Sequence, residues 1–255
     1  MNQYKNIVVK VGTNVLTNED GSLDLKVISS LVEQISDLKK NGIDVVLVSS
    51  GAVGAGKSVC EMDHIEDEIS RRQAYSSIGQ VKLMGLYSEQ FAKHGLVCAQ
   101  VLATKDDFIG KEHYKNMTNC FESLMKDNVI PIVNENDVVS LTELMFTDND
   151  ELAALTAFMI KAEALVILTS VDGLYIDFEN KVLLGNYKKS ESIAGLEKYV
   201  DEHKSSQGRG GMSSKIEVAR RMKEKGIVTH IANGKHEDTL LKIVKGGTLG
   251  TTFEA

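Results

Sequence analysis

Residues 43–58 read IDVVLVSSGAVGAGKS, an apolar run that leads directly into a loop of small residues. The pattern G-x-x-x-x-G-K-S, which in a P-loop wraps the phosphates of a nucleotide, is met by Gly51, Gly56, Lys57 and Ser58. A loop of small residues that opens a helix also exposes backbone N–H groups to other anions. It is equally typical of a tight turn in which small side chains let a strand and a helix pack closely. The rest of the chain decides between these interpretations.

The composition predicts an ordinary globular protein. The chain has 255 residues, of which 42% are hydrophobic and 25% are charged, so we expect a single domain over 1–255 with a sizeable core. Its net charge of −7 argues against nucleic-acid binding. The cysteines are odd in number and form no C-x-x-C, and no apolar run has the length of a signal peptide core or a membrane span. We therefore expect a cytoplasmic protein that makes no membrane contact.

Apolar runs and amphipathic runs alternate along the chain. The predicted strands are 5–11, 43–49, 96–103, 129–133, 164–170 and 227–232. The predicted helices are 25–40 with Asp24 as N-cap, one within 68–94, 112–127, 151–162 with Asp150 as a candidate N-cap, 212–225 and 236–244. Residues 172–210 are polar and rich in turn formers. Alternation of this kind, with continuously apolar strands, predicts an α/β fold whose mostly parallel sheet is covered by helices on both faces.

Ligands of open parallel sheets bind beyond the carboxyl ends of the strands, and Lys10 lies at such an end. An ammonium there costs free energy to bury unless an anion meets it. One interpretation is a phosphate-binding lysine next to Gly12, which lets backbone amides approach an anion. The other is a lysine whose stem lies along the strand while its head reaches water.

Two further strand ends carry dense polar residues. Asn134-Glu135-Asn136-Asp137 follows 129–133, and residues 146–150 read FTDND. Such residues beside a buried strand bind an amino group through their oxygens or place Mg²⁺ by way of water, whereas Asx-turns and a helix cap explain part of 147–150. Residues 208–215, GRGGMSSK, combine glycines, hydroxyls and Lys215 at a predicted helix start, which is typical of a phosphate cradle. A flexible loop with a helix cap is the alternative.

Taken together, these segments resemble one family. VVKVGTNVLT, SSGAVGAG, NENDVV, FTDND, VDGLY, GRGGMSSK, IANGK and GTLGTTF occur in the order typical of the glutamate 5-kinases, within the amino acid kinase family. The resemblance covers essentially the whole chain. It implies a three-layer αβα sandwich around a central, mostly parallel sheet. It also implies phosphorylation of the γ-carboxylate of L-glutamate by ATP with Mg²⁺, giving L-glutamyl 5-phosphate and ADP in the first step of proline biosynthesis.

The resemblance also implies roles for individual residues. It gives catalytic roles to Lys10, Asp150 and Lys215, with Asp150 organising the two lysines. It places the substrate against Ser50, Gly51, Asp137 and Asn149. It places the nucleotide against Lys10, Thr169, Ser170, Arg209, Gly210, Gly211, Met212, Ser213, Ser214 and Lys215. It assigns no residue as a metal ligand.

The sequence departs from the family pattern in three ways. Ser170 stands where the family more often has Asp, and Arg209 stands where a small residue is common. Many bacterial relatives continue into a C-terminal PUA domain, which we do not expect here.

The family also forms dimers or tetramers, so a homo-oligomer is expected. Feedback inhibition by L-proline is a further expectation, with the polar stretch 60–75 as a candidate contributor.

Two alternative functions remain at the level of the sequence. Other members of the family phosphorylate acetylglutamate, aspartate, carbamate or UMP, and substrate choice within a shared fold depends on few contacts. A P-loop nucleotide hydrolase or kinase would instead use Lys57. That interpretation leaves Lys10, NENDVV and GRGGMSSK unexplained, and strand 164–170 ends in Thr-Ser rather than in the acidic residue that holds Mg²⁺ in P-loop enzymes.

Overall fold

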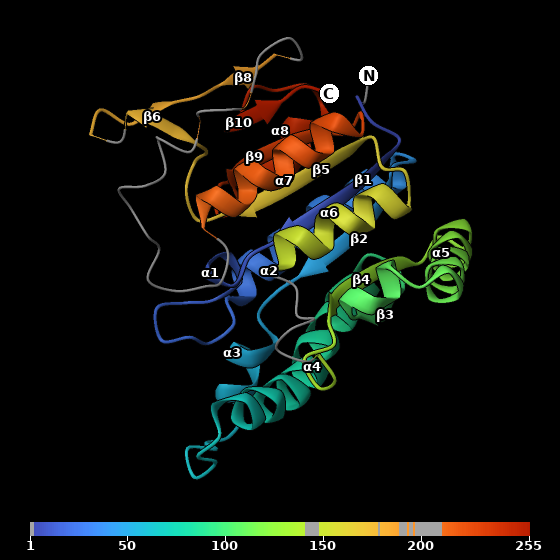
Figure 1. Cartoon of the computed structure of the whole chain (residues 1–255), viewed down its shortest axis with the longest axis vertical. Coiled ribbons are helices and arrows are strands. Elements are labelled where there is room, and N and C mark those ends of the chain that lie inside the picture. The colour runs from blue at the N-terminus through green and yellow to red at the C-terminus, as the bar shows by residue number, and fades with distance from the viewer. Residues whose placement is uncertain (1–2, 141–147, 178, 189–192, 194–195, 197–210) are drawn as a thin grey trace.

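A central sheet of eight strands runs through the molecule (Figure 1). The computed structural model describes residues 3–140, 148–177, 179–188, 193, 196 and 211–255. The strand order is β3-β4-β2-β1-β5-β9-β10-β8. The bounds are β1 (Asn6–Val11), β2 (Asp44–Ser49), β3 (Cys98–Ala103), β4 (Ile130–Glu135), β5 (Ala164–Thr169), β8 (Asn186–Tyr187), β9 (Val228–Asn233) and β10 (Thr251–Phe253).

The sheet is mostly parallel, as the sequence predicts. All neighbours from β3 through β9 pair in parallel, and only the pairing of β10 with β9 is antiparallel, while β8 runs parallel to β10. All six predicted strands are present, with ends shifted by one or two residues. The short strands β8 and β10 and the hairpin of β6 (Tyr175–Asp177) with β7 (Val182–Leu183) were missed. Strands of two or three residues are too short to show a period in the sequence.

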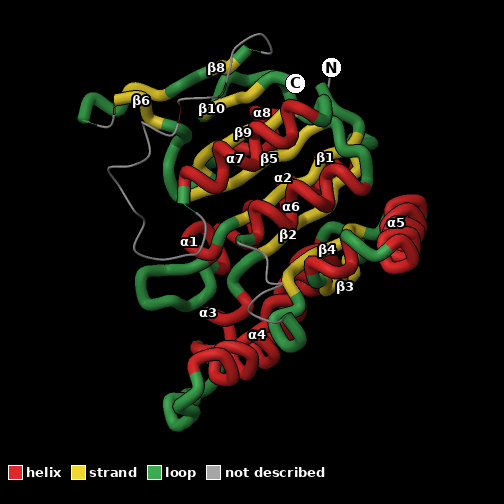
Figure 2. Tube along the Cα trace, in the orientation of Figure 1, coloured by secondary structure: helices red, strands yellow, loops and turns green. Residues whose placement is uncertain are grey.

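Helices cover both faces of the sheet, which makes three layers (Figure 2). The helices α2 (Leu25–Lys40), α4 (Glu68–Lys93) and α8 (Thr239–Val244) cover one face, and α5 (Lys111–Lys126), α6 (Asn149–Met159) and α7 (Met212–Glu224) cover the other. Short helices α1 (Thr13–Leu16), α3 (Ala52–Lys57) and η1 (Lys105–Phe108) follow β1, β2 and β3. The predicted α/β sandwich is confirmed. No helix in the described part of the chain is long and apolar enough to cross a membrane.

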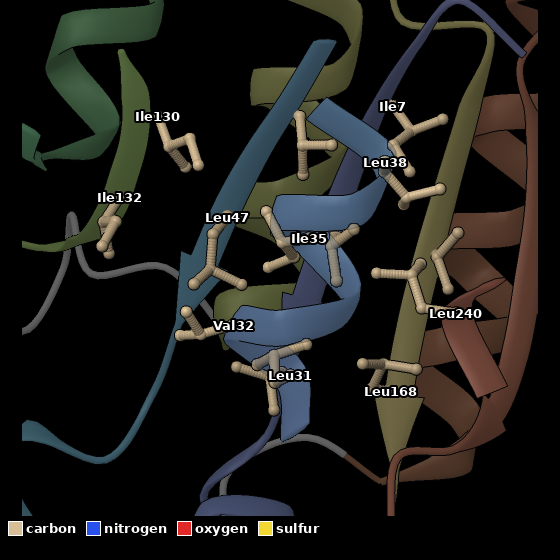
Figure 3. Packing of buried hydrophobic residues seen from close by; sticks show 14 of the residues in the cluster. Ile7, Leu31, Val32, Ile35, Leu38, Leu47, Ile130, Ile132, Leu168 and Leu240 are labelled. Carbon is tan, nitrogen blue, oxygen red and sulfur yellow. The ribbon is translucent and has the colours of Figure 1, made fainter. Parts of the chain in front are cut away.

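Strand alternation decides on which face each side chain lies. Figure 3 shows the core beneath α2, where Leu31, Ile35 and Leu38 pack against the sheet. Val9 and Val11 of β1 point into this core, whereas Val8 points to the opposite core under α6 and α7. Because side chains alternate along a strand, Lys10 lies on the face of Val8. The only lysine of β1 is therefore directed toward α6.

Candidate active site

The centre of the candidate site is a buried ion-pair triad of two lysines and one aspartate. Lys10 Nζ lies 2.6 Å from Asp150 Oδ1, and Lys215 Nζ lies 2.8 Å from Asp150 Oδ2. The Asp150 side chain is 0% exposed and each lysine side chain is 7% exposed. The two ammoniums therefore sit on either side of one carboxylate, at the carboxyl end of β1 and the amino ends of α6 and α7. The sequence-predicted catalytic residues are brought together.

Two helix starts aim these side chains at one another. Asp150 lies in the first turn of α6 and Lys215 lies in the first turn of α7. The prediction that Asp150 caps α6 was wrong, because Asp148 is the N-cap and its Oδ1 accepts from the backbone N–H groups of Asp150 and Glu151. With the cap supplied by Asp148, the Asp150 carboxylate is left to face the lysines. The anion that a lysine at a helix N-terminus requires is here supplied, for Lys215, by Asp150.

The charges of the triad support one another. Burial alone would raise the pKa of Asp150, but the Lys10 and Lys215 ammoniums outweigh it and hold that pKa below its ordinary value. Asp150 is therefore an anion at neutral pH. Two ammoniums and one carboxylate leave a net positive charge among these three groups. Such a site attracts an anion, and its dry surroundings strengthen the attraction.

Two of the substrate residues predicted from the sequence, Ser50 and Asn149, are joined by a hydrogen bond next to the triad. Asn149 directly precedes Asp150, and its Nδ2 donates to Ser50 Oγ at 2.8 Å and to Asn134 Oδ1 at 2.9 Å. Gly51 adopts φ 102°, a conformation that favours glycine, and so turns the chain from β2 and Ser50 into α3. Asn149 and Ser50 are both half-buried, so they are partly accessible to a ligand, unlike the buried triad.

Asp137 is held by α4 through contacts that the sequence did not predict. Arg72 Nη2 lies 2.6 Å from Asp137 Oδ1, and Ser76 Oγ donates to Asp137 Oδ2 at 2.7 Å. Asp137 also lines a pocket of about 300 Å³ between α4 and the ends of β3 and β4. Arg72 and Ser76 were missed because they lie within α4, 65 and 61 residues from Asp137, with no local pattern that links them.

The nucleotide residues predicted from the sequence lie only partly within the described structure. Arg209 and Gly210 lie outside the described residues. Thr169 ends β5, and Ser170 is exposed just beyond it. Gly211 is the N-cap of α7 without a side-chain cap, and Met212, Ser213 and Ser214 form the turn that carries Lys215. Thr169 and this turn lie at the same edge of the sheet as the triad.

The loop 49–58 does not have the geometry of a P-loop. In a P-loop the Gly-Lys-Ser opens the helix, but here α3 begins at Ala52 and Lys57 lies in its last turn. Lys57 is exposed, and its Nζ lies 5.8 Å from the Tyr75 ring centroid. A Cβ atom on Gly56 would overlap the backbone of Tyr75 in α4. The glycine that completes the motif is therefore needed for close helix packing.

No protein-borne metal centre is found among the described residues. No three His, Cys, Asp or Glu side chains there are grouped so as to hold a metal ion. The carboxylate nearest the centre, Asp150, is engaged by two lysines. In kinase sites Mg²⁺ takes many of its oxygen ligands from the substrate phosphates and from water.

Comparison with known proteins places the chain in a family. The model of the amino acid kinase family matches residues 5–233. A protein named glutamate 5-kinase from Bacteroides thetaiotaomicron is 43% identical over 95% of this chain and 68% of its own length. Another protein of that name, from Chlorobaculum tepidum, is 44% identical over 99% of this chain and 70% of its own length.

Solved structures show the same fold. Carbamate kinase from Giardia lamblia, solved bound to AMP-PNP, superimposes with a TM-score of 0.72 at 21% identity and covers 100% of this chain and 99% of its own. UMP kinase from Bacillus anthracis superimposes with a TM-score of 0.65 at 12% identity and covers 98% of this chain and 96% of its own. At these identities the likeness concerns the fold alone. Together with the family match and the sequence relatives, it means that this chain belongs to the amino acid kinase family.

Proposed function

We propose that the protein transfers the γ-phosphoryl group of ATP to the γ-carboxylate of L-glutamate. The products are L-glutamyl 5-phosphate and ADP, and the reaction is the first step of proline biosynthesis. The observation that carries the proposal is the identity of 43% and 44% with two glutamate 5-kinases over 95% and 99% of this chain. The buried pair of lysines around Asp150 supports it, because phosphoryl transfer requires positive charge where the transition state is negative.

Lys10 and Lys215 are proposed as the groups that stabilise the transferring phosphoryl. A lysine ammonium carries three N–H donors, so an ion pair with Asp150 still lets it bind phosphoryl oxygens. Asp150 orients both ammoniums and is not the base. No base is needed, because the γ-carboxylate of glutamate is already ionised at neutral pH. The residues thus act by positioning and by charge.

Glutamate is proposed to bind at Ser50, Gly51, Asp137 and Asn149. Carboxylate and amide oxygens suit its ammonium group, while hydroxyl and backbone N–H groups suit its α-carboxylate. Because Asn149 is adjacent to Asp150, a substrate held by Asn149 lies next to the lysine pair. The adjacency of Asn149 and Asp150 supports a position of the acceptor carboxylate beside the phosphoryl group.

ATP is proposed to bind along Thr169, Ser170 and residues 209–215, at the uncapped start of α7. Backbone N–H groups at a helix start and a lysine in its first turn suit phosphate oxygens. Mg²⁺ supplies charge neutralisation between the nucleotide phosphates. Carbamate kinase, the fold neighbour bound to AMP-PNP, shares the fold at 21% identity.

Other properties are proposed from the resemblance. Residues 1–255 are proposed to act as one kinase unit and to assemble as a dimer or tetramer. The stretch 60–75 includes Arg72, which contacts Asp137, so this stretch is suited to transmit inhibition by L-proline to the glutamate site.

A cytoplasmic location is proposed as well, and the three unpaired cysteines, Cys60, Cys98 and Cys120, support it.

The test is a hydroxamate assay with ATP, Mg²⁺ and hydroxylamine. L-Glutamate is compared with aspartate, N-acetylglutamate, carbamate and UMP, with ADP release as a common second readout. Hydroxamate from glutamate, with ADP release well above that of every other acceptor, is the expected result. ADP release that depends on a different acceptor would contradict the proposed substrate.

A further inference from the structure

The orientation of the Asn134 side-chain amide is fixed by the backbone. The N–H of Glu135 donates to Asn134 Oδ1 at 2.9 Å. A backbone N–H is always a donor, so the atom that meets it must be the amide oxygen and not the nitrogen. Asn134 Nδ2 then points the other way and donates to Gln80 Oε1 in α4 at 3.1 Å. Asn134 is 4% exposed and Gln80 is 8% exposed, so both are held within the protein.

The fixed orientation of the Asn134 amide also determines the orientation of the Asn149 amide. Asn134 Oδ1 also accepts from Asn149 Nδ2 at 2.9 Å. Because two oxygens do not hydrogen-bond to each other, Asn149 must turn its nitrogen toward Asn134. The second hydrogen of Asn149 Nδ2 goes to Ser50 Oγ at 2.8 Å. Both donors of Asn149 are then directed into the protein, and its carbonyl oxygen is left as the acceptor on the open side.

Ser50 takes the opposite hydrogen-bonding role to that of Asn149. Its Oγ accepts from Asn149, so its own proton is directed elsewhere. No side chain or carbonyl among the described residues accepts that proton. The Asn149 carbonyl oxygen, an acceptor, and the neighbouring Ser50 hydroxyl, a donor, thus face the candidate substrate site. This pair matches an ammonium and a carboxylate, the two groups on the α-carbon of an amino acid.

We propose that Asn134 is a positioning residue that sets this polarity, so that Asn149 offers its carbonyl oxygen to the substrate ammonium and Ser50 offers its hydroxyl proton to the α-carboxylate. The inference rests on the proposed function, since it concerns how glutamate is recognised. An Asn149 amide turned the other way would present N–H groups and repel an ammonium. The Asn134 oxygen, itself held by the Glu135 N–H, excludes that orientation.

The experiment compares L-glutamate with glutarate, which has the same two carboxylates but no ammonium group. The ratio of kcat/KM for glutamate to that for glutarate is measured in the wild type, Asn134→Leu and Asn134→Asp. In Asn134→Leu the acceptor at 2.9 Å is lost, and the Asn149 amide nitrogen keeps only the Ser50 hydroxyl and the more distant Ser49 carbonyl, at 3.5 Å. The amide is then held less firmly in one orientation, so the ratio falls about 10- to 100-fold, the effect of one hydrogen bond to a charged group. KM for glutamate rises while KM for ATP stays the same.

Asn134→Asp keeps an oxygen facing both the Glu135 N–H and Asn149, so its ratio lies closer to the wild-type ratio than that of Asn134→Leu. The matched control is Gln34→Leu, which removes another buried side-chain amide, one that joins α2 to α8 on the face of the sheet opposite α6. It lowers the melting temperature and leaves the ratio unchanged. A parallel loss toward glutamate and glutarate in Asn134→Leu, or an equal loss in Asn134→Asp, would overturn the inference. A wild type inactive with glutamate would instead overturn the proposed function.

Discussion

Lys10 Nζ lies 2.6 Å from Asp150 Oδ1, which joins the carboxyl end of β1 to the first turn of α6 across the face of the sheet. The same carboxylate meets Lys215 through its second oxygen. A single buried aspartate therefore sets the position of two ammoniums from different elements. The geometry makes Asp150 the residue on which both charges depend.

Replacing Asp150 by Asn is expected to impair both stability and turnover. Removal of one partner from a buried ion pair costs about 3–5 kcal/mol, because the remaining charge is left buried without compensation. We expect the free energy of unfolding in urea to fall by that order. We also expect kcat to fall at least about 100-fold, as when one group that stabilises the transition state is lost.

The matched control for Asp150→Asn is Glu89→Gln. Glu89 Oε1 lies 3.2 Å from Lys93 Nζ, and the side chains of both residues are exposed, Glu89 by 64% and Lys93 by 55%. Water compensates the lost ion pair there, so the cost is expected to stay below about 1 kcal/mol. Equal losses of stability in the two variants would contradict the special role of the buried triad.

Lys57→Ala separates the two interpretations of the loop 49–58. Lys57 is exposed and its ammonium lies over the Tyr75 ring, away from the buried triad, so kcat is expected to stay near the wild-type value. Lys10→Ala and Lys215→Ala are each expected to lower kcat by about 10² to 10³ or more. Steady-state kinetics with ATP and glutamate measure all three. Loss of turnover in Lys57→Ala with normal Lys10→Ala would restore the P-loop interpretation.

Gly79→Ala is expected to disrupt the packing of α3 against α4. A Cβ atom at Gly79 would overlap the backbone of Ala52 and Gly56, so the two helices must separate. Overpacking of this kind costs about 1–3 kcal/mol or more. Gly85→Ala in the same helix is the control, because nothing lies near its added Cβ. It is expected to stabilise the protein by about 0.5–1 kcal/mol in thermal or urea unfolding.

Arg72→Met is expected to weaken glutamate binding. Arg72 is the cation that meets Asp137 Oδ1, so its loss leaves the carboxylate with the Ser76 hydroxyl but without a charged partner on α4. KM for glutamate should rise about tenfold or more, while kcat and KM for ATP change little. The lost contact holds glutamate equally in the ground state and in the transition state, so its loss raises KM without lowering kcat. Arg71→Met, one residue away on α4, is the control and should leave KM for glutamate unchanged. Equal effects of the two substitutions would contradict a role of Arg72 through Asp137.

The stability of the protein is expected to fall as pH drops from 6.5 to 4. Burial lowers the pKa of His230 from 6.5 to about 4, and its ring bonds to Tyr4 and Thr252. Between these pH values the unfolded chain binds the proton and the folded protein does not, so stability is complete above pH 6.5 and is lost on acidification. The shifted pKa of His230 contributes up to about 3 kcal/mol to the free energy of unfolding above pH 6.5.

Urea unfolding of His230→Gln across this pH range tests the prediction, since a glutamine does not titrate there. The variant should show a shallower dependence of the free energy of unfolding on pH than the wild type. Tyr4→Phe keeps the histidine and should lower stability while retaining the slope. An unchanged slope in His230→Gln would show that other groups cause the acid sensitivity.

The order of strands and helices could be predicted from the sequence because it depends on local periods. Continuous apolar runs such as 43–49 mark buried parallel strands, and the spacing in 25–40 marks a helix with one buried face. Polar residues at strand ends, including Lys10 and Asp137, mark the edge where ligands bind. These signals need only a few neighbouring residues, so they are present in the chain before it folds.

Contacts between distant segments were decided only when the chain folded. Arg72 meets Asp137 and Gln80 meets Asn134 across 65 and 54 residues, and no local pattern joins them. The G-x-x-x-x-G-K-S match fails for the same reason, since the packing of Gly56 against α4 depends on a helix encoded elsewhere. Likewise, Asp148 rather than Asp150 caps α6, because Asp150 forms ion pairs with lysines that come from β1 and α7. Local periodicity specifies the elements, whereas burial and charge pairing between elements specify what each polar side chain does.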